Sequence, residues 1–219
     1  MPDKSILITV TDPNSAAAEA YQALRVNLTF AGLDKPIESL MVACVASDEA
    51  SPSVAANLAV ALARAEQRVI LIEADLRRPS LHEVFDLPNE RGLTTMIVEP
   101  EALETPPLAE VGIENLWVLP SGPLAPNPAD ILGSRKMDRV IEVLKSRADV
   151  LVFSAPPVIA VPDAAVLGNK VDGALLVVNS GKTRRDYVQR AKDVLEKAHV
   201  RIVGAVLSNA PHGTLLGKY

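Results

Sequence analysis

Aromatic side chains and cysteine are scarce in this chain of 219 residues. Aromatic residues make up 3% of the sequence and hydrophobic residues 48%, so the core must be built from Val, Leu, Ile and Ala. That composition is typical of buried parallel strands and the helices that cover them. The single cysteine, Cys44, excludes a disulfide framework or a cysteine metal site, which fits a reducing cytosol. We expect Cys44 to be a small buried side chain within its apolar run.

The sequence also has no excess of positive charge and no long apolar run. The net charge of −5 argues against a nucleic-acid or anionic-membrane surface. No apolar run reaches the roughly 18 residues that span a bilayer, and the N-terminus does not resemble a signal peptide. We therefore expect a cytoplasmic chain, placed at the inner face of the cell membrane by a partner or by a membrane segment that this sequence lacks.

Apolar runs alternate with helical patterns along the chain, which predicts one α/β domain over residues 1–219. Right-handed crossovers then give a doubly wound, mostly parallel sheet with helices on both faces. Residues 1–15 are expected to be an extended arm that ends at the helix N-cap Ser15, and residues 211–219 a short tail. The expected strands are Ser39–Val45, Val69–Glu73, Leu116–Leu119, Val150–Ser154, Ala174–Val178 and Ile202–Leu207. The expected helices are Ala16–Phe30, Ser53–Ala65, Leu81–Phe85, Leu93–Ile97, Pro128–Leu132, Lys136–Arg147 and Arg185–Ala198.

Ligands of such sheets bind at the carboxyl ends of the strands, and the loops found there carry recognisable motifs. Strand Val69–Ile72 leads into Glu73-Ala-Asp75-Leu-Arg77, which resembles the second Walker A segment of bacterial tyrosine kinases, a branch of the deviant P-loop ATPases. The segment Ser121–Leu132 resembles the family's Gly-x-x-x-Pro-Asn-Pro motif, and Phe153–Val158 resembles its Walker B strand followed by Pro-Pro. Near the start of the chain, a helix with Glu19, Gln22, Arg25 and Asn27 is similar to the family's ring-assembly helix. The resemblance covers most of residues 16–210. It implies a P-loop NTPase-like fold, and ATP with Mg²⁺ as cofactors of active members.

The phosphate-binding loop departs from the family pattern. Where the family reads Gly-Glu-Gly-Lys-Ser-Thr before Asn-Leu-Ala, this chain reads Asp48-Glu49-Ala50-Ser51-Pro52-Ser53. Asp48 would repel a phosphate at 4 Å by about 4 kcal/mol at an effective dielectric constant of 20. Ser51 removes the lysine charge, and Pro52 removes both the Mg²⁺-binding hydroxyl and a backbone N–H. We expect Ser51 to cap a helix whose first residue is Pro52. We also expect the loop Ala46–Pro52 to be compact and to close over the position that phosphate occupies in the family.

Further positions of the expected site leave alternatives open. Ser154 stands where the Walker B aspartate would hold the metal's water shell. Glu73 and Asp75 either retain some metal or nucleotide binding or form a polar cluster with Arg77 and Arg78. Asp163 is interpreted as a helix cap, and Asn209 matches a family position near the adenine. The histidines His82, His199 and His212 are scattered and predict no metal site.

Three hypotheses follow for the function. In the first, the chain is a pseudokinase-like assembly or regulatory module in exopolysaccharide or capsule biosynthesis and export. It would bind no cofactor, form at most weak homo-oligomers and bind a membrane-embedded chain-length regulator. In the second, it is an active ATP-dependent tyrosine autokinase with an unusual P-loop, although only Tyr219 follows the last strand. In the third, it is a partition- or septum-site-type positioning protein that has lost its switch.

Overall fold

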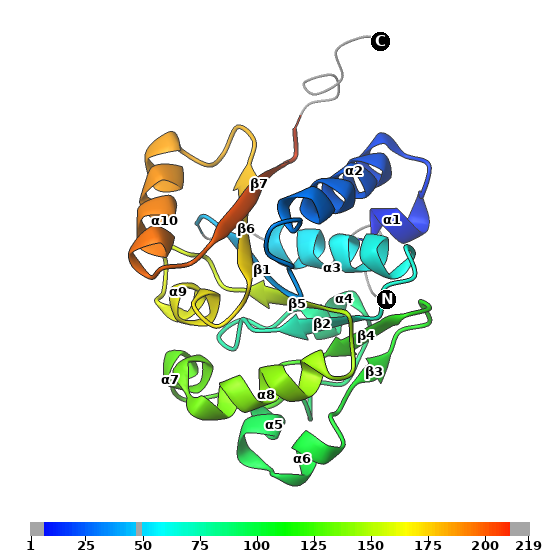
Figure 1. The fold of residues 1–219 in the computed structure, drawn as a ribbon, viewed down its shortest axis with the longest axis vertical. Coiled ribbons are helices and arrows are strands. Elements are labelled where there is room, and N and C mark those ends of the chain that lie inside the picture. The colour runs from blue at the N-terminus through cyan, green and yellow to red at the C-terminus, as the bar shows by residue number, and fades with distance from the viewer. Residues whose placement is uncertain (1–6, 47–49, 211–219) are drawn as a thin grey trace.

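One sheet of seven strands forms the centre of the molecule in the computed structural model, which describes residues 7–46 and 50–210 (Figure 1). The strand order is β3-β4-β2-β5-β1-β6-β7, and every neighbouring pair is parallel except β3 and β4. The strands are β1 (Ser39–Cys44), β2 (Val69–Glu73), β3 (Ala109–Glu110), β4 (Leu116–Leu119), β5 (Val150–Ala155), β6 (Gly173–Asn179) and β7 (Ile202–Ser208). The predicted doubly wound α/β fold is confirmed.

The three central strands are hydrophobic without a polar face. Every residue of β1, β2 and β5 is buried, as expected for strands that are covered on both sides. Cys44 at the end of β1 is 1% exposed, which confirms that it is a buried side chain. The apolar side chains of the sheet divide into two clusters, one on each face.

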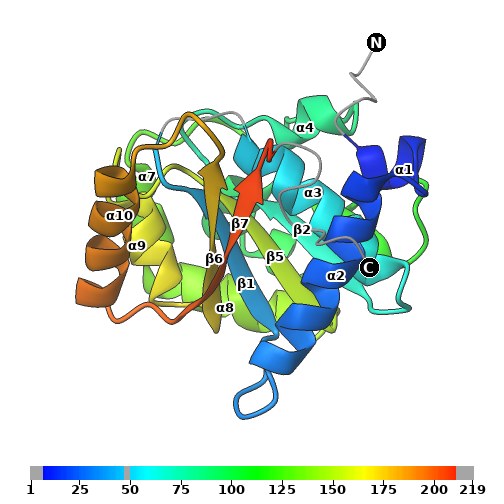
Figure 2. The same ribbon diagram turned by 90° about the horizontal axis from the view of Figure 1, so that it is seen from above.

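Helices cover both faces of this sheet (Figure 2). One layer contains α2 and α3, and the other contains α5, α7, α8, α9 and α10. The helices are α1 (Ile8–Thr11), α2 (Ala16–Ala31), α3 (Ala50–Ala63), α4 (Leu81–Val84), α5 (Leu93–Val98), α6 (Glu101–Glu104), α7 (Pro128–Gly133), α8 (Arg135–Lys145), α9 (Asp163–Gly168) and α10 (Arg185–Lys197). In the described parts of the chain, no helix combines the length and the hydropathy needed to cross a membrane.

The N-terminal arm differs from its prediction. Within the expected extended segment 1–15, residues 8–11 form the short helix α1, which packs against α3. Buried Thr9 is the anchor: its amide nitrogen and its hydroxyl donate to Asn57 Oδ1 over 3.0 and 2.8 Å. Two bonds to one buried side chain hold the arm against α3. The N-cap Ser15 is confirmed, since its side chain accepts from Ala18 N at 3.2 Å.

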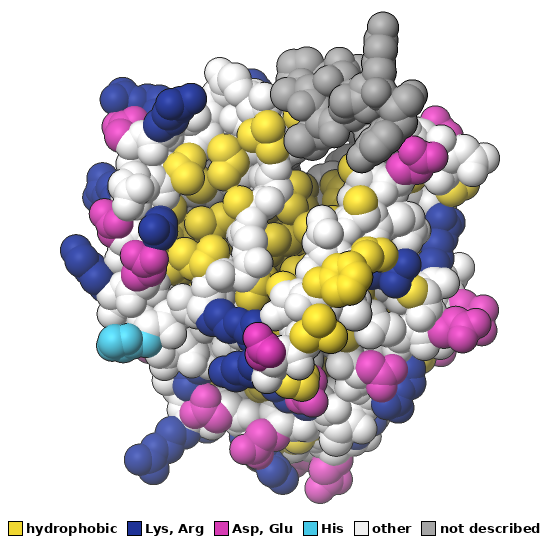
Figure 3. All heavy atoms as spheres, turned by 45° about the horizontal axis from the view of Figure 1, so that its top comes forward, with side chains coloured by type: hydrophobic (Ala, Val, Ile, Leu, Met, Phe, Trp, Pro, Cys, Tyr) yellow, Lys and Arg dark blue, Asp and Glu magenta, His cyan; other side chains and the backbone are white. Residues whose placement is uncertain are grey.

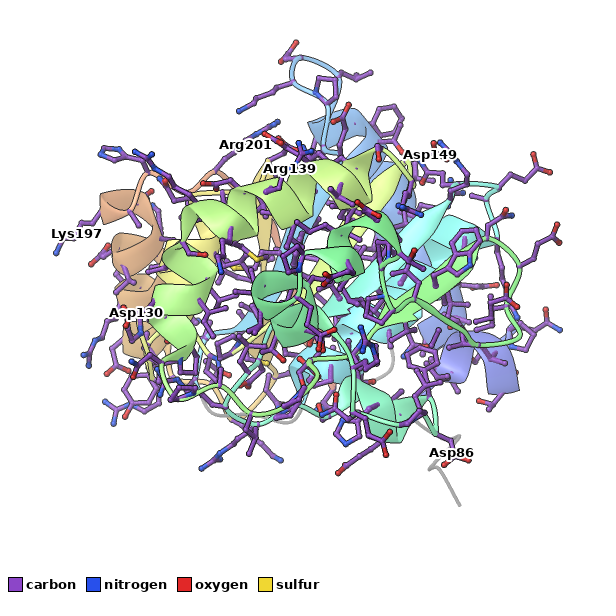
Figure 4. The ribbon with its side chains drawn as sticks, turned by 90° about the horizontal axis from the view of Figure 1, so that it is seen from below. Asp86, Asp130, Arg139, Asp149, Lys197 and Arg201 are labelled. Atoms are coloured by element: carbon purple, nitrogen blue, oxygen red, sulfur yellow. The ribbon has the colours of Figure 1, made fainter. Side chains whose placement is uncertain are left out.

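The two ends of the sheet carry different loops. Asp149 and Arg201 immediately precede β5 and β7, so they mark the amino ends of the strands, whereas Asp86 lies beyond the carboxyl end of β2 (Figure 4). The motif-bearing loops follow β1, β2 and β5 and therefore all lie at the carboxyl end.

Candidate functional site

The loops at the carboxyl ends of β1, β2 and β5 are held together by backbone hydrogen bonds. Ala74 N donates to Ser154 O over 2.8 Å, which joins the loop after β2 to the end of β5. Val158 N donates to Cys44 O over 2.9 Å, so the Pro-Pro segment after β5 crosses toward the end of β1. The sheet register also places Ser154 beside both Val42 and Glu73. Three motifs distant in sequence thus meet at one end of the sheet.

The start of α3 contains Ser51 and Pro52, which the sequence resemblance aligns with a phosphate-binding loop. The helix begins at Ala50, earlier than predicted, so Ser51 and Pro52 belong to its first turn and Ser51 is not its N-cap. Proline is tolerated there because first-turn N–H groups have no partner within the helix. Ser51 is 4% exposed, and its hydroxyl donates to Val42 O over 3.2 Å.

The next residue, Ser53, takes part in a hydrogen bond within α3. The backbone carbonyl of Ser53 accepts from Asn57 Nδ2 at 2.8 Å. Asp48 and Glu49 lie outside the described residues, as does the centre of the predicted closed loop.

Ser154, which the sequence resemblance aligns with the Walker B aspartate, is a buried residue of β5. It is 1% exposed, and its Oγ has no hydrogen-bond partner among the described residues. A buried hydroxyl without a partner costs about 1–3 kcal/mol. This hydroxyl therefore lowers the stability of the core at this position.

Glu73 is a fully buried carboxyl group at the end of β2. It accepts hydrogen bonds from three backbone amides, those of Asp75 at 3.1 Å and of Ser80 and Leu81 at 2.8 Å each. Burial raises the pKa of Glu73 to about 7, because loss of hydration outweighs the three amides that favour the carboxylate. The side chain thereby fixes the loop after β2 and the start of α4.

The polar cluster predicted for Glu73, Asp75, Arg77 and Arg78 forms with different partners. Asp75 Oδ1 accepts from the backbone amides of Arg77 and Arg78 at 3.1 and 2.9 Å, so it stabilises a turn. The Arg77 side chain instead pairs with Asp163, through Nε–Oδ2 and Nη2–Oδ1 distances of 2.8 and 2.9 Å. Asp163 is the first residue of α9 and makes no capping bond, so its interpretation as a helix cap was wrong.

The remaining predicted site residue lies apart from this cluster. Asn209 follows β7, is exposed, and donates from Nδ2 to Asn179 Oδ1 over 3.3 Å. The described residues contain no group of three or more His, Cys, Asp or Glu side chains arranged to hold a metal ion.

The residues of the expected ring-assembly helix lie on α2, where Glu19, Gln22 and Arg25 follow one another at a spacing of three and form a polar stripe. Glu19, Gln22 and Asn27 are exposed and Arg25 is partly exposed. Arg25 Nε donates to Gln22 Oε1 over 3.3 Å, so these two side chains share one helix face as the spacing of three predicts.

Sequence reasoning missed two contacts that shape this region. The bonds from Thr9 to Asn57 were hidden because the arm shows no helical periodicity. The pair Arg77–Asp163 joins residues 86 positions apart, and no local pattern signals such a contact. The arginine pair Arg77-Arg78, which begins four residues after β2, gave a hint of an ionic contact but not of its partner.

The sequence is similar to those of known bacterial proteins. The chain is 37% identical over 202 residues to "Tyrosine-protein kinase YwqD" of Bacillus subtilis (strain 168), covering 92% of this chain and 85% of that protein. It is 33% identical to "Tyrosine-protein kinase etk" of Escherichia coli (strain K12) over 92% of this chain and 28% of that protein. No protein-family profile matches the chain.

Solved structures agree with the sequence relatives. The kinase domain of Escherichia coli tyrosine kinase ETK is similar with a TM-score of 0.86 and 31% identity, over 97% of this chain and 84% of that one. The chimerical protein CapA2B2 also gives 0.86, at 30% identity over 93% and 89% of the two chains. The septum site-determining protein MinD from Pyrococcus horikoshii, complexed with Mg-ADP, gives 0.62 at 24% identity over 77% and 70%, a likeness of fold alone.

Proposed function

The chain belongs to the family of bacterial tyrosine-protein kinases, and we propose that within it this chain is a catalytically degenerate assembly or regulatory module. The proposal places the module in exopolysaccharide or capsule biosynthesis and export, on the strength of the Pro-Asn-Pro segment and the assembly helix. Its partner would be a membrane-embedded chain-length regulator or that protein's cytosolic segment. The module would work at the inner face of the cell membrane, with weak self-association.

The observation that carries the proposal is the environment of Ser51, at the position of the family's P-loop lysine. A phosphate loop needs that lysine to neutralise the β- and γ-phosphate charge. Ser51 supplies no charge, and its hydroxyl is directed to the carbonyl of Val42 rather than outward. The following Pro52 has neither the hydroxyl nor the N–H that Mg·ATP would need.

The other end of the site supports the same conclusion. A magnesium ion in such a site prefers carboxylate oxygens and water, and buried Ser154 offers a neutral hydroxyl at the Walker B position. The remaining acids have partners of their own: backbone amides surround Glu73, and Arg77 neutralises Asp163. The described residues at these positions do not fit Mg·ATP, so we assign no cofactor and no phosphoryl-transfer step.

An active tyrosine autokinase remains the second candidate, favoured by the kinase names of relatives that match over most of their length. Asp75 also retains an acid of the second Walker A segment. The third hypothesis, a positioning protein, has support only from a shared fold.

Incubation with Mg·ATP followed by mass spectrometry distinguishes the first two candidates. If the chain is a degenerate module, no phosphotyrosine should form on Tyr219. The variant Tyr219→Phe is the negative control. A variant that restores the family residues, Asp48→Gly with Ala50→Gly, Ser51→Lys, Pro52→Ser and Ser154→Asp, should gain nucleotide binding. Phosphotyrosine on the unaltered chain would establish the kinase instead.

A further inference from the structure

Charge is distributed unevenly between the two edges of the sheet. The segment 182–201, which contains α10 and leads into β7, carries seven Lys or Arg against three Asp or Glu, a formal charge of +4. The segment 83–114, which contains α5, α6 and β3, carries one Arg against eight Asp or Glu, a formal charge of −7. Strands β7 and β3 are the two edge strands. The net charge of −5 therefore averages over a basic edge and an acidic edge and describes neither.

Most cations of the basic edge have no acidic partner. The three acids of segment 182–201 are already bonded, in the pairs Arg184–Asp186, Lys192–Glu196 and Gln189–Asp193. The other five cations form no ion pair with any described residue, and they are Lys182, Arg185, Arg190, Lys197 and Arg201. Four of these five are exposed, whereas Arg201 donates to the carbonyls of Ala31 and Lys35 and fixes the end of α2 beside β7. The basic edge thus presents uncompensated positive charge along the whole of α10.

Exposed apolar side chains gather on the same edge. Of the eight large hydrophobic side chains that are exposed among the described residues, five lie on α2 and the turn after it, on α10 or on β7. These five are Val26, Phe30, Leu33, Tyr187 and Leu207, and Phe30 and Leu33 are 64% and 73% exposed. Strand β7 lies between α2 and α10 in both ribbon views (Figures 1 and 2). Figure 3 shows hydrophobic side chains between these two helices, with Lys and Arg side chains around them.

An anionic lipid surface fits this combination of groups. Lys and Arg side chains are attracted by the negative potential of anionic headgroups, and apolar side chains gain by leaving water at the boundary of the acyl chains. A tyrosine such as Tyr187 suits the headgroup level, where its ring is shielded and its hydroxyl stays in water. Nucleic acid would use the cations alone, because its phosphate backbone offers no apolar surface to Phe30 or Leu33.

The acidic edge does not oppose such a contact. Six spacings of about 4.8 Å separate β3 from β7 in the seven-stranded sheet, a distance of roughly 29 Å. The Debye length at physiological ionic strength is about 8 Å, so repulsion between the acidic edge and the lipids is screened over that distance. The separation of charge also orients the molecule, since only the basic edge is attracted.

We propose that the edge formed by α10, β7 and the C-terminal half of α2 docks directly on an anionic lipid surface, with the acidic edge directed into solution. The inference rests on the location at the membrane given in the proposed function, and it adds a contact that the chain makes by itself. It does not depend on the state of the nucleotide site.

Sedimentation with lipid vesicles tests the proposal on the full chain without nucleotide or partner protein. The probes are vesicles of phosphatidylglycerol and phosphatidylcholine in equal parts, and vesicles of phosphatidylcholine alone. We expect binding to the mixed vesicles only, and weaker binding as salt screens the attraction. Arg185→Gln/Arg190→Gln should weaken binding at least about tenfold through lost charge. Phe30→Ser/Leu33→Ser should weaken it at least about tenfold through lost apolar contact.

Matched controls carry the same kinds of change at other surfaces. Arg135→Gln/Arg139→Gln removes two exposed arginines from α8 and changes the net charge equally. Val98→Ser/Leu124→Ser removes two side chains that are 71% and 72% exposed. Both control variants should bind the mixed vesicles like the unaltered chain.

Three results would overturn the proposal. The first is that the unaltered chain does not bind the mixed vesicles at low salt, which refutes the lipid contact and leaves the degenerate nucleotide site to the titration with Mg·ATP. The second is equal weakening in the control variants, which would assign binding to overall charge and hydrophobicity. The third is a dimer that forms without vesicle binding and is lost in Phe30→Ser/Leu33→Ser, which would assign the apolar surface to a second copy of the chain.

Discussion

Arg77 and Asp163 form a two-bonded ion pair across the candidate site, between the loop after β2 and the first turn of α9. Asp163 is completely buried, whereas the Arg77 side chain is 42% exposed. The pair therefore neutralises a carboxylate that has no access to water, and it fixes the loop that resembles the second Walker A segment. The two bonds hold the loop after β2 against the first turn of α9.

Removal of Arg77 should destabilise the protein more than its exposure suggests. Arg77→Ala leaves the buried carboxylate of Asp163 without its counter-charge, and breaking a buried pair in this way costs about 3–5 kcal/mol. Because Arg77 is partly exposed, we expect roughly 2–3 kcal/mol in urea unfolding.

The matched control is Arg68→Ala. Arg68 also bonds a carboxylate, that of Asp149, but both side chains are about half exposed. Its loss should change the free energy of unfolding much less, because ion pairs exposed to water contribute little. Equal losses for the two variants would show that burial of Asp163 does not decide the energetics.

Stability should fall with rising pH because of Glu73. The pKa of Glu73 is about 7 in the folded chain against 4.5 as the ordinary value, so the native state binds more protons between these limits. The stabilising contribution is complete below pH 4.5 and is lost as the pH rises through 7, a change of about 3 kcal/mol.

Glu73→Gln has no carboxyl group to titrate and should lose this slope in unfolding measured from pH 5 to pH 8. Glu83→Gln, at an exposed position of α4, should keep it. Parallel curves for the unaltered chain and Glu73→Gln would refute the assignment.

The arm should detach when its anchor is removed. Thr9→Val deletes the hydroxyl that donates to Asn57 Oδ1 and keeps the shape of the side chain. We expect a loss of about 1–2 kcal/mol and faster proteolysis within residues 7–12. Thr11→Val, at an exposed hydroxyl of the same helix, is the control, and equally fast cleavage of both variants would argue against a specific anchor.

Self-association should depend on the stripe along α2. A glutamine at position 22 cannot form the bidentate charge-assisted bond of an arginine, so the isolated chain should assemble weakly. Gln22→Arg should strengthen assembly in light scattering at micromolar concentration, and Arg25→Ala should abolish it. A stable ring that Arg25→Ala leaves intact would mean that another surface joins the subunits.

The sequence predicted the sheet better than the site. Buried strands such as Val69–Glu73 form from continuous apolar runs, so their positions follow from local composition. The short antiparallel β3, two residues long, has too little pattern to be seen. The start of α3 shifted because a proline is compatible with several positions of a first turn, so Pro52 alone could not fix the register.

Partners of charged side chains were the least predictable features. The position of Glu73 after a strand indicated a polar cluster, but its bonds to the amides of Ser80 and Leu81 depend on how the following loop returns to the sheet. The pairing of Arg77 with Asp163 depends on where tertiary packing places α9. Local sequence carries neither piece of information.

Calorimetric titration of Mg·ATP onto the pure protein tests the central claim most directly. The account predicts no binding, or a dissociation constant weaker than about 100 μM, because Ser51, Pro52 and Ser154 supply neither the charge nor the metal ligands of a nucleotide site. The variant with restored family residues serves as the positive control. A dissociation constant below about 100 μM for the unaltered chain, equivalent to more than roughly 5 kcal/mol of binding, would contradict the account.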